Sequence, residues 1–155
     1  MTPCIRLLKK HNIPYKIHQY EHDSTSLSYG EEAALKLDAK ANQIFKTLVV
    51  ISDKEEFAVA VIPVTSKLSL KNTAKAFGAK KISMARTKDV EKTTGYILGG
   101  VSPLGQKKRL PTIIDESCKN HETILVSAGK RGLDVELSPY DLQKLLNAKF
   151  KAVAV

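Results

Sequence analysis

Residues 99–109 combine residue types that can hold an oxyanion or a phosphate. They read Gly-Gly-Val-Ser-Pro-Leu-Gly-Gln-Lys-Lys-Arg. Glycine permits positive φ and lets a ligand approach the main chain, while Pro103 fixes the shape of the loop. Because Lys107, Lys108 and Arg109 follow directly, backbone N–H groups and cations would lie together. The pattern is also typical of a tight turn followed by a solvated basic strand end.

A second small, basic turn lies at residues 127–132, directly after the apolar residues 124–126. It reads Ser-Ala-Gly-Lys-Arg-Gly. It does not fit the G-x-x-x-x-G-K-[ST] phosphate loop, because Arg131 follows Lys130 and the glycine spacing differs. An ordinary β-turn with solvated charges remains an alternative. Two glycine-containing basic turns in one small chain nevertheless favour a shared anion site.

Lys46 stands at the start of an apolar run, residues 47–51, and is a candidate for substrate contact. A lysine at the mouth of a buried strand is partly desolvated, so its charge needs a partner such as a carbonyl oxygen or a phosphate. The alternative is a lysine whose stem packs along the strand while its ammonium reaches water.

Other residues that could do chemistry carry weaker signals. His18, His22 and Asp23 are close in sequence, but their spacing fits neither a zincin helix nor a zinc finger, and no activated nucleophile accompanies them. Cys4 falls on the apolar face of a predicted helix and Cys118 in a polar loop, so neither is expected to be a nucleophile. No metal or other cofactor is expected.

The composition is that of a single domain spanning residues 1–155. Hydrophobic residues make up 43% and charged residues 26%, which is ordinary for a soluble globular protein. No apolar run is long enough to span a membrane, and the first residues do not form a signal peptide. Two distant cysteines without a C-x-x-C pair favour the reducing cytoplasm.

The formal net charge is +9, from 25 Lys+Arg against 16 Asp+Glu. This excess favours a polyanionic partner such as RNA or DNA, although solubility alone would also account for it. Aromatic residues are sparse and tryptophan is absent, so the stacking platform of single-strand binders is not evident.

The elements that must position these residues alternate without a regular βαβ rhythm. Helices are predicted after Thr2-Pro3, over residues 28–37 with Ser28 and Glu31 at capping-box spacing, after Ser69 as far as Gly78, and after Ser138-Pro139. Strands are predicted at residues 15–20, 47–52, 57–64, 113–114, 124–126, 135–137 and 153–155. This order predicts an α+β fold with a mixed, barrel-like sheet.

Several motifs together resemble the bacterial YbaK family, and the resemblance runs nearly end to end. They are Thr2-Pro3, Tyr20-Glu21-His22-Asp23, Phe45-Lys46-Thr47-Leu48, Thr94-Gly95-Tyr96, residues 99–109, residues 110–115 and residues 129–133. The family is similar to the editing domain inserted in bacterial prolyl-tRNA synthetase. The resemblance implies a mixed, barrel-like sheet flanked by helices. It also implies hydrolytic removal of cysteine from tRNA for proline, with tRNA for cysteine as a further substrate.

The resemblance implies roles for individual residues. Lys46 matches the family's pocket lysine, and residues 99–103 match its G-x-x-x-P loop, in which Gly99 and Gly100 would face the oxyanion, with Gly100 as the favoured backbone donor. Substrate-binding positions would be Tyr20, Tyr29, Thr47, Ser102, Pro103, Ser127 and Asp134. Residues that would meet the tRNA backbone by charge alone are Lys107, Lys108, Arg109, Lys130 and Arg131.

Two positions depart from the family pattern. Ala128 stands where the second turn commonly has glycine, so a positive φ there would cost on the order of 1 kcal/mol. Tyr29 stands where relatives often have phenylalanine, which leaves the size and polarity of the pocket at that point open.

The implied mechanism needs no nucleophile from the protein, because a cysteinyl ester carries its own thiol. Attack of that thiol on the ester carbonyl would release tRNA and a cyclic thiolactone, while the protein supplies orientation and oxyanion stabilisation. Contacts by charge alone read no sequence, so a partner, prolyl-tRNA synthetase, would select the tRNA. Two alternatives stay open: an editor of alanyl-tRNA(Pro) that positions a water, and a non-catalytic RNA-binding module.

Overall fold

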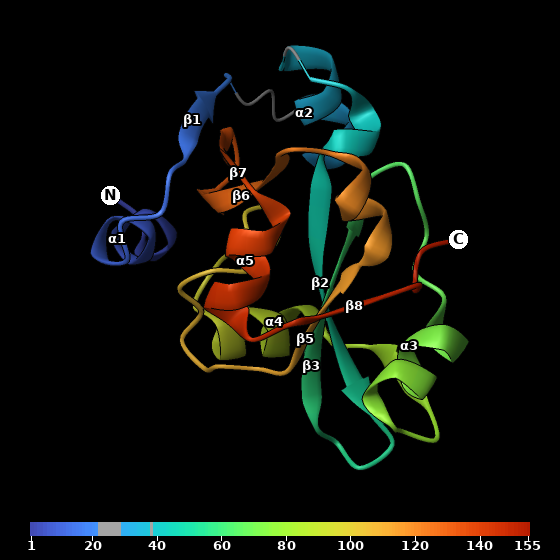
Figure 1. Cartoon of the computed structure of the whole chain (residues 1–155). Helices are drawn as coiled ribbons and strands as arrows, with labels where there is room; N and C mark the ends of the chain where they lie inside the picture. The colour runs from blue at the N-terminus through green and yellow to red at the C-terminus, as the bar shows by residue number, and fades with distance from the viewer. Residues whose placement is uncertain (22–28, 38) are drawn as a thin grey trace.

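Two β-sheets with helices around them make up the protein (Figure 1). The computed structural model describes residues 1–21, 29–37 and 39–155. The predicted α+β class is confirmed. In this described part the sheets do not close into the predicted barrel; a parallel bridge between Ile44 and Leu125 links them instead.

The larger sheet is built on two of the predicted strands, β2 (Phe45–Ser52) and β3 (Phe57–Pro63), which pair antiparallel with Lys46 opposite Ile62. β4 (Ile82–Met84), which the sequence analysis missed, pairs with β2. β5 (Thr112–Asp115) and β8 (Lys149–Lys151) continue the sheet from β3 in parallel, giving the strand order β4-β2-β3-β5-β8. The apolar residues of β3 and β5 are buried, as expected for strands in the middle of a covered sheet.

The strand predicted at residues 153–155 is wrong in its position. The chain leaves the ladder after β8, where the carboxylate of Asp115 accepts the N–H groups of Val153 and Ala154 at 2.9 Å each. Ala154 then forms an isolated bridge with Leu68. A buried side chain therefore takes the backbone donors that a strand would have given to its neighbour.

The smaller sheet contains β1 (Lys16–Gln19), β7 (Leu133–Leu137) and β6 (Ile124–Lys130), all antiparallel and in that order. The strand predictions in these regions are confirmed. The β6–β7 pairing shifts register between Ser127 and Lys130, which is a β-bulge. β6 continues past this shift as far as Lys130, which pairs with Leu133, so the second basic turn closes the β6–β7 hairpin.

Short helices flank the sheets, and most begin at predicted caps. Thr2, Ser69 and Ser138 each accept a backbone N–H in the first turn of α1 (Pro3–Lys10), α3 (Leu70–Phe77) and α5 (Pro139–Leu146). α4 (Thr87–Thr94) was not predicted; its N-cap Arg86 makes no side-chain capping bond. α2 covers Tyr29–Lys36, and its predicted cap, Ser28, lies outside the described residues. Two 3-10 turns are η1 (Ala41–Gln43) and η2 (Glu116–Asn120).

The helices divide the core into a large part and smaller ones. α1, α4 and α5 contribute to the cluster that includes Phe45 and Val126, whereas α3 packs on Val50 and Ile82. α2 packs Ala33 and Leu37 against Ile44 and Leu125, so it covers the end of the molecule where β2 begins and the two sheets meet (Figure 1). Among the described helices, none has the length and apolar character needed to cross a membrane.

Candidate active site

The two basic glycine turns meet at the end of the molecule that α2 covers. A Cβ on Gly100 would lie 2.9 Å from the backbone nitrogen of Arg131 and 3.0 Å from the Cα of Lys130. No larger residue fits there unless the backbone moves, so Gly100 allows the turns to touch. Gly99 has φ +94°, and a Cβ on it would lie 3.7 Å from Nη1 of Arg131. The structure thus brings together the turns from which a shared anion site was predicted.

The N–H groups of the two glycines have different partners. The N–H of Gly100 donates to the carbonyl of Ile97 at 2.9 Å and closes a turn. No acceptor among the described residues takes the N–H of Gly99. Of the two predicted oxyanion donors, Gly100 thus has an N–H engaged in a turn, whereas the N–H of Gly99 is left for a ligand; their roles in the reaction stay predictions.

Ser102 and Pro103 are buried in the first loop, and Pro103 also borders a hollow between α1 and α5; their role in binding substrate stays a prediction. The hydroxyl of Ser102 accepts the N–H of Leu104 at 3.1 Å, and its carbonyl accepts from the Gln106 side chain at 2.9 Å. Tyr96 adds a bond from its hydroxyl to the carbonyl of Leu104, at 2.6 Å. These contacts hold the loop in one shape, so Ser102 and Pro103 support it from within.

Gly129, rather than residue 128, has the unusual conformation in the second turn. Its φ is +106°, and a Cβ on it would lie 2.6 Å from the ring of Tyr96. Ala128 is fully buried in the core and does not have positive φ. The strain considered for alanine at this position is therefore absent. Ser127 stabilises the turn, because its hydroxyl accepts the N–H of Gly129 at 3.1 Å.

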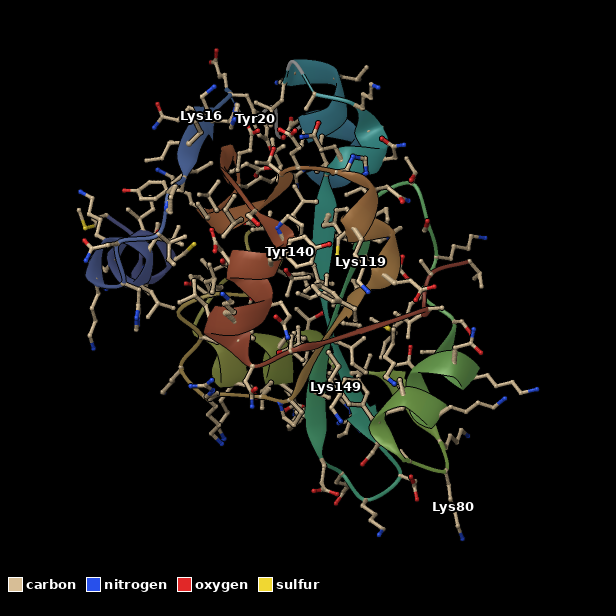
Figure 2. All side chains as sticks on the ribbon, in the orientation of Figure 1. Lys16, Tyr20, Lys80, Lys119, Tyr140 and Lys149 are labelled. Atoms are coloured by element: carbon tan, nitrogen blue, oxygen red, sulfur yellow. The ribbon has the colours of Figure 1, made fainter. Side chains whose placement is uncertain are left out.

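β1 brings Tyr20 to the second turn, between β1 and α2 (Figure 2). Its N–H donates to the carbonyl of Gly132 at 2.9 Å, and it borders a hollow of about 520 Å³ that Lys130 and Arg131 also line. Its hydroxyl is buried and has no hydrogen-bond partner within the described residues. Burial, and then the nearby Asp134 carboxylate, raise the pKa of Tyr20 to about 12. The phenol therefore stays protonated and can donate to a substrate oxygen.

Asp134 and Ser127 lie on the same face of the smaller sheet as Tyr20. Asp134 pairs with His18 on one side and with Ser127 on the other, so all three side chains share one face. Tyr20 follows His18 by two residues and continues this face. Asp134 is fully buried and Ser127 nearly so. The structure thus groups three of the predicted substrate-binding residues.

Lys46 stands on the larger sheet, close to the bridge that links the two sheets. It follows Ile44 by two residues of extended chain, so the side chains of Ile44 and Lys46 share a face. Ile44 packs with Leu125 in a small apolar cluster, and Tyr20 packs against that cluster. Burial lowers the pKa of Lys46. Its ammonium has no hydrogen bond or ion pair with any described residue. The hydroxyl of Thr47 is also buried without a partner in the described part. Both groups can take a polar ligand.

Glu32 was not among the site residues predicted from the sequence. This glutamate lies on α2, is 1% exposed, and contacts Nε of Arg131 at 3.3 Å and Nζ of Lys36 at 3.6 Å. In the sequence it belongs to an ordinary charged helix segment, because the partner Arg131 is 99 residues away. Its burial depends on the tertiary fold, so the sequence carried no signal for it.

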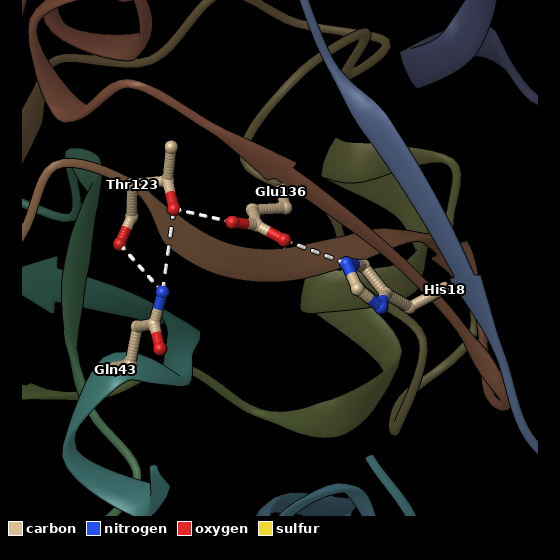
Figure 3. Close-up of polar contacts among 4 residues, drawn as sticks. All are labelled: His18, Gln43, Thr123 and Glu136. Atoms are coloured by element: carbon tan, nitrogen blue, oxygen red, sulfur yellow. Dashed lines mark hydrogen bonds and ion pairs between the residues drawn. The ribbon is translucent and has the colours of Figure 1, made fainter. Parts of the chain in front are cut away.

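A chain of polar contacts fixes β1 against the elements that lead into β2 (Figure 3). The ring of His18 contacts Glu136 at 2.7 Å, and Thr123 donates to the other oxygen of that carboxylate at 2.5 Å. Gln43 then donates to the carbonyl and hydroxyl of Thr123. The hydrogen bond from Thr123, followed by the one from His18, lowers the pKa of Glu136. His18 therefore has a structural partner, while His22 and Asp23 lie outside the described residues.

The remaining predicted positions are spread more widely. Lys107, Lys108 and Arg109 are exposed, and the N–H groups of the two lysines donate to Thr94 and Thr93 at the end of α4. Lys108 and Arg109 border a separate hollow of about 590 Å³ between α1 and α5. The loop thus carries cations away from the two turns. Tyr29 begins α2, but its side chain lies outside the described ones.

Both cysteines are buried, and burial raises the pKa of Cys4 to about 11 and of Cys118 to about 12. Cys118 lies in the core rather than in the predicted polar loop, because η2 turns it inward. A buried thiol with a raised pKa is a poor nucleophile. The prediction that neither cysteine is a nucleophile agrees with this environment.

The chain is similar to known proteins along most of its length. Residues 26–145 match the family model of the aminoacyl-tRNA editing domain. A protein of Enterococcus faecalis (strain ATCC 700802 / V583), EbsC, provisionally named a Cys-tRNA(Pro)/Cys-tRNA(Cys) deacylase, is 43% identical over 152 residues, covering 98% of this chain and 92% of EbsC. The uncharacterised protein YwhH of Bacillus subtilis (strain 168) is 27% identical over 125 residues, covering 81% and 79% of the two chains.

Solved structures share the fold over the whole chain. The hypothetical protein APE2540 matches with a TM-score of 0.87 and 22% identity, covering 99% of each chain. A structure provisionally described as a trans-editing enzyme for prolyl-tRNA synthetase matches with a TM-score of 0.82 and 21% identity, covering 100% of this chain and 99% of the other.

Proposed function

Because the chain belongs to the aminoacyl-tRNA editing domain family, we propose that it removes cysteine from mischarged Cys-tRNA(Pro), with Cys-tRNA(Cys) as a further substrate. One observation of the geometry supports the proposal: the two glycine turns meet beside Tyr20, and we assign Lys46 to the same region. An N–H donor, a buried phenol and cations therefore surround one region. These are the groups that an ester carbonyl next to a phosphate backbone requires.

The substrate supplies the nucleophile in the proposed reaction. Its thiol sulfur attacks its own ester carbonyl; the C–S bond forms, the C–O bond to the terminal ribose breaks, and the thiol proton ends on the leaving ribose oxygen. The products are tRNA and a cyclic thiolactone. The chain's own cysteines are buried with raised pKa values, which supports a thiol that arrives with the substrate.

The protein's share of the reaction is orientation and charge stabilisation. The N–H of Gly99 would donate to the developing oxyanion, and Lys46 would hold the carbonyl oxygen or the terminal phosphate as a clamp rather than as a base. Tyr20, Thr47, Ser127 and Asp134 would line the amino-acid pocket. Holding the thiol near its carbonyl provides a large effective-molarity gain.

Selection of the tRNA would come from outside the site. Lys107, Lys108, Arg109, Lys130 and Arg131 would contact the acceptor-stem backbone, and such contacts position a nucleic acid without reading its sequence. Prolyl-tRNA synthetase, which makes the mischarged ester, is the proposed partner. The cytoplasm, where that ester arises, is the proposed location.

The test is deacylation of Cys-tRNA(Pro), Ala-tRNA(Pro) and Pro-tRNA(Pro) by wild type and Lys46→Ala. Rapid loss of the cysteinyl ester alone, abolished in the variant, is expected. Loss of the alanyl ester instead would identify an editor that positions a water. Binding of all three tRNAs with no turnover would identify an RNA-binding module.

A further inference from the structure

Glu32 and Arg131 form a contact that the proposed reaction does not itself explain. Glu32 is 1% exposed on α2, and its carboxylate lies 3.3 Å from Nε of Arg131. Burying a carboxylate costs free energy unless cations and hydrogen bonds compensate. Lys36 supplies a second cation at 3.6 Å, four residues further along the helix. The fold therefore buries a carboxyl group between two cationic side chains beside the second turn.

The side of the Arg131 side chain that carries Cδ and Nη1 lies against the first turn. Its Cδ and Nη1 would each be 3.7 Å from a Cβ on Gly99, while Glu32 contacts the guanidinium through Nε. The side chain is 29% exposed and borders the hollow that Tyr20 also lines. The Nε edge of the guanidinium thus faces a buried carboxylate, and the Cδ–Nη1 edge lies alongside Gly99.

Lys36 links this contact to β1. Its ammonium donates to the carbonyl of Glu21, directly after Tyr20, as well as contacting Glu32. α2 is therefore tied both to the end of β1 and to the second turn. An arginine held from this side has a fixed direction, whereas no side chain in the described part of the chain holds the exposed Lys130 next to it.

We propose that Glu32 is a positioning residue that aims the Arg131 guanidinium beside Gly99, where it forms a fixed site for a phosphate of the single-stranded CCA end. The inference rests on the proposed function and assigns Arg131 to one phosphate near the ester, rather than to the stem. Arginine suits this role because its planar fork binds phosphate in a defined geometry, whereas lysine acts as a point charge.

The test measures binding of the trinucleotide CCA and of adenosine, which lacks phosphate, to folded variants. Arg131→Lys keeps the charge but loses the fork, and it is expected to weaken CCA binding by about 10-fold while adenosine binding is unchanged. Glu32→Gln is expected to do the same, and the double variant should be no weaker than Arg131→Lys alone, because the two act as a unit. Glu32→Asp should restore part of the affinity.

Lys36→Ala is the matched control, because it removes the other cation on Glu32 without touching Arg131. Its CCA affinity is expected to stay within about 2-fold of wild type. Equal loss in Lys36→Ala and Glu32→Gln, or additive losses in the double variant, would show a merely structural role and overturn the proposal. Full CCA affinity in Arg131→Lys would do so as well.

Kinetics separate this inference from the proposed function. With Cys-tRNA(Pro), Glu32→Gln should raise KM more than it lowers kcat. If the wild type deacylates no ester but the variants change CCA binding as described, the proposed function fails and the phosphate site stands. If deacylation is normal in all variants and CCA binding is unchanged, the phosphate site fails alone.

Discussion

Gly99 and Gly100 are adjacent, and each position requires glycine for a different structural reason. Gly100 is required by contact, since a Cβ there would meet the backbone of Lys130 and Arg131. Gly99 has positive φ and an N–H that no described acceptor takes. Sequence alone identified the pair but could not separate the two roles, because the difference depends on a turn nearly thirty residues further along the chain.

Gly100→Ala is expected to push the two turns apart. Relief of a 2.9 Å contact requires backbone movement, so deacylation should fall by about 10²-fold, and the free energy of unfolding should fall by about 1–3 kcal/mol. Gly78→Ala is the matched control: Gly78 has φ +71° but nothing within 4 Å of a Cβ. That variant should lose about 1 kcal/mol of stability yet keep its kcat. Equal kcat values for the two variants would contradict the contact role.

Lys46 gives a prediction about pH. Because burial lowers its pKa, the folded protein releases this proton at a lower pH than the unfolded chain, whose lysine titrates near about 10.4. Between those two pKa values, stability rises with pH while the cation needed for binding is lost. NMR titration of 13C-dimethylated lysines, with Lys46→Ala to assign the signal, should show Lys46 titrating at a lower pH in the folded protein than in the urea-unfolded chain. An unshifted pKa for Lys46 would contradict the proposal that its ammonium is desolvated in the site.

At the scale of elements, the sequence predicted what local patterns determine. The β2–β3 hairpin and the capped helices α1, α3 and α5 were found because apolar runs and capping residues are local signals. α4 was missed because it is rich in threonine and lysine, buries a single large apolar residue, Val90, and has no side-chain cap. The burial of Glu32, and of Ser102 inside its loop, depends on residues brought together by the fold.

The hydrogen bonds of Glu136 with Thr123 and His18 should make the free energy of unfolding fall at acidic pH. The pKa of Glu136 is lowered in the folded state, so its contribution is present above the unfolded value of about 4.3 and is lost as pH falls through the folded value. Urea unfolding at pH 7 and at pH 3 should show a smaller loss of stability on acidification for Glu136→Gln than for wild type. Glu122→Gln, at an exposed neighbouring position, should behave as wild type. The same acid sensitivity in Glu136→Gln would count against this contribution.

At the scale of the whole molecule, positive charge is spread rather than confined to the site. The net charge is +9, and Lys16, Lys80, Lys119 and Lys149 lie at well-separated positions (Figure 2). Charge alone therefore did not locate the tRNA-binding face. The predicted basic loop runs from the glycine turns toward α1 and α5, so it extends the proposed contact surface beyond the reaction site.

Lys108→Ala tests that extension. Loss of one phosphate contact should weaken tRNA binding for every tRNA and reduce the slope of log K against log salt by about 1, with kcat nearly unchanged. Lys80 lies at the other end of the molecule from Tyr20 (Figure 2), so the control Lys80→Ala should leave the slope as in wild type. An unchanged slope in Lys108→Ala would confine the tRNA contact to the two glycine turns.

In the proposed reaction the substrate's thiol performs the attack. The first measurement is therefore a comparison of Cys-tRNA(Pro) with Ser-tRNA(Pro) under single-turnover conditions. The two esters differ in one atom, sulfur or oxygen, and a hydroxyl is a far weaker nucleophile at neutral pH. If the thiol performs the attack, we expect rapid release of tRNA from the cysteinyl ester and retention of the seryl ester. Release of both at similar rates would contradict it, because a site that activates water would not require the thiol.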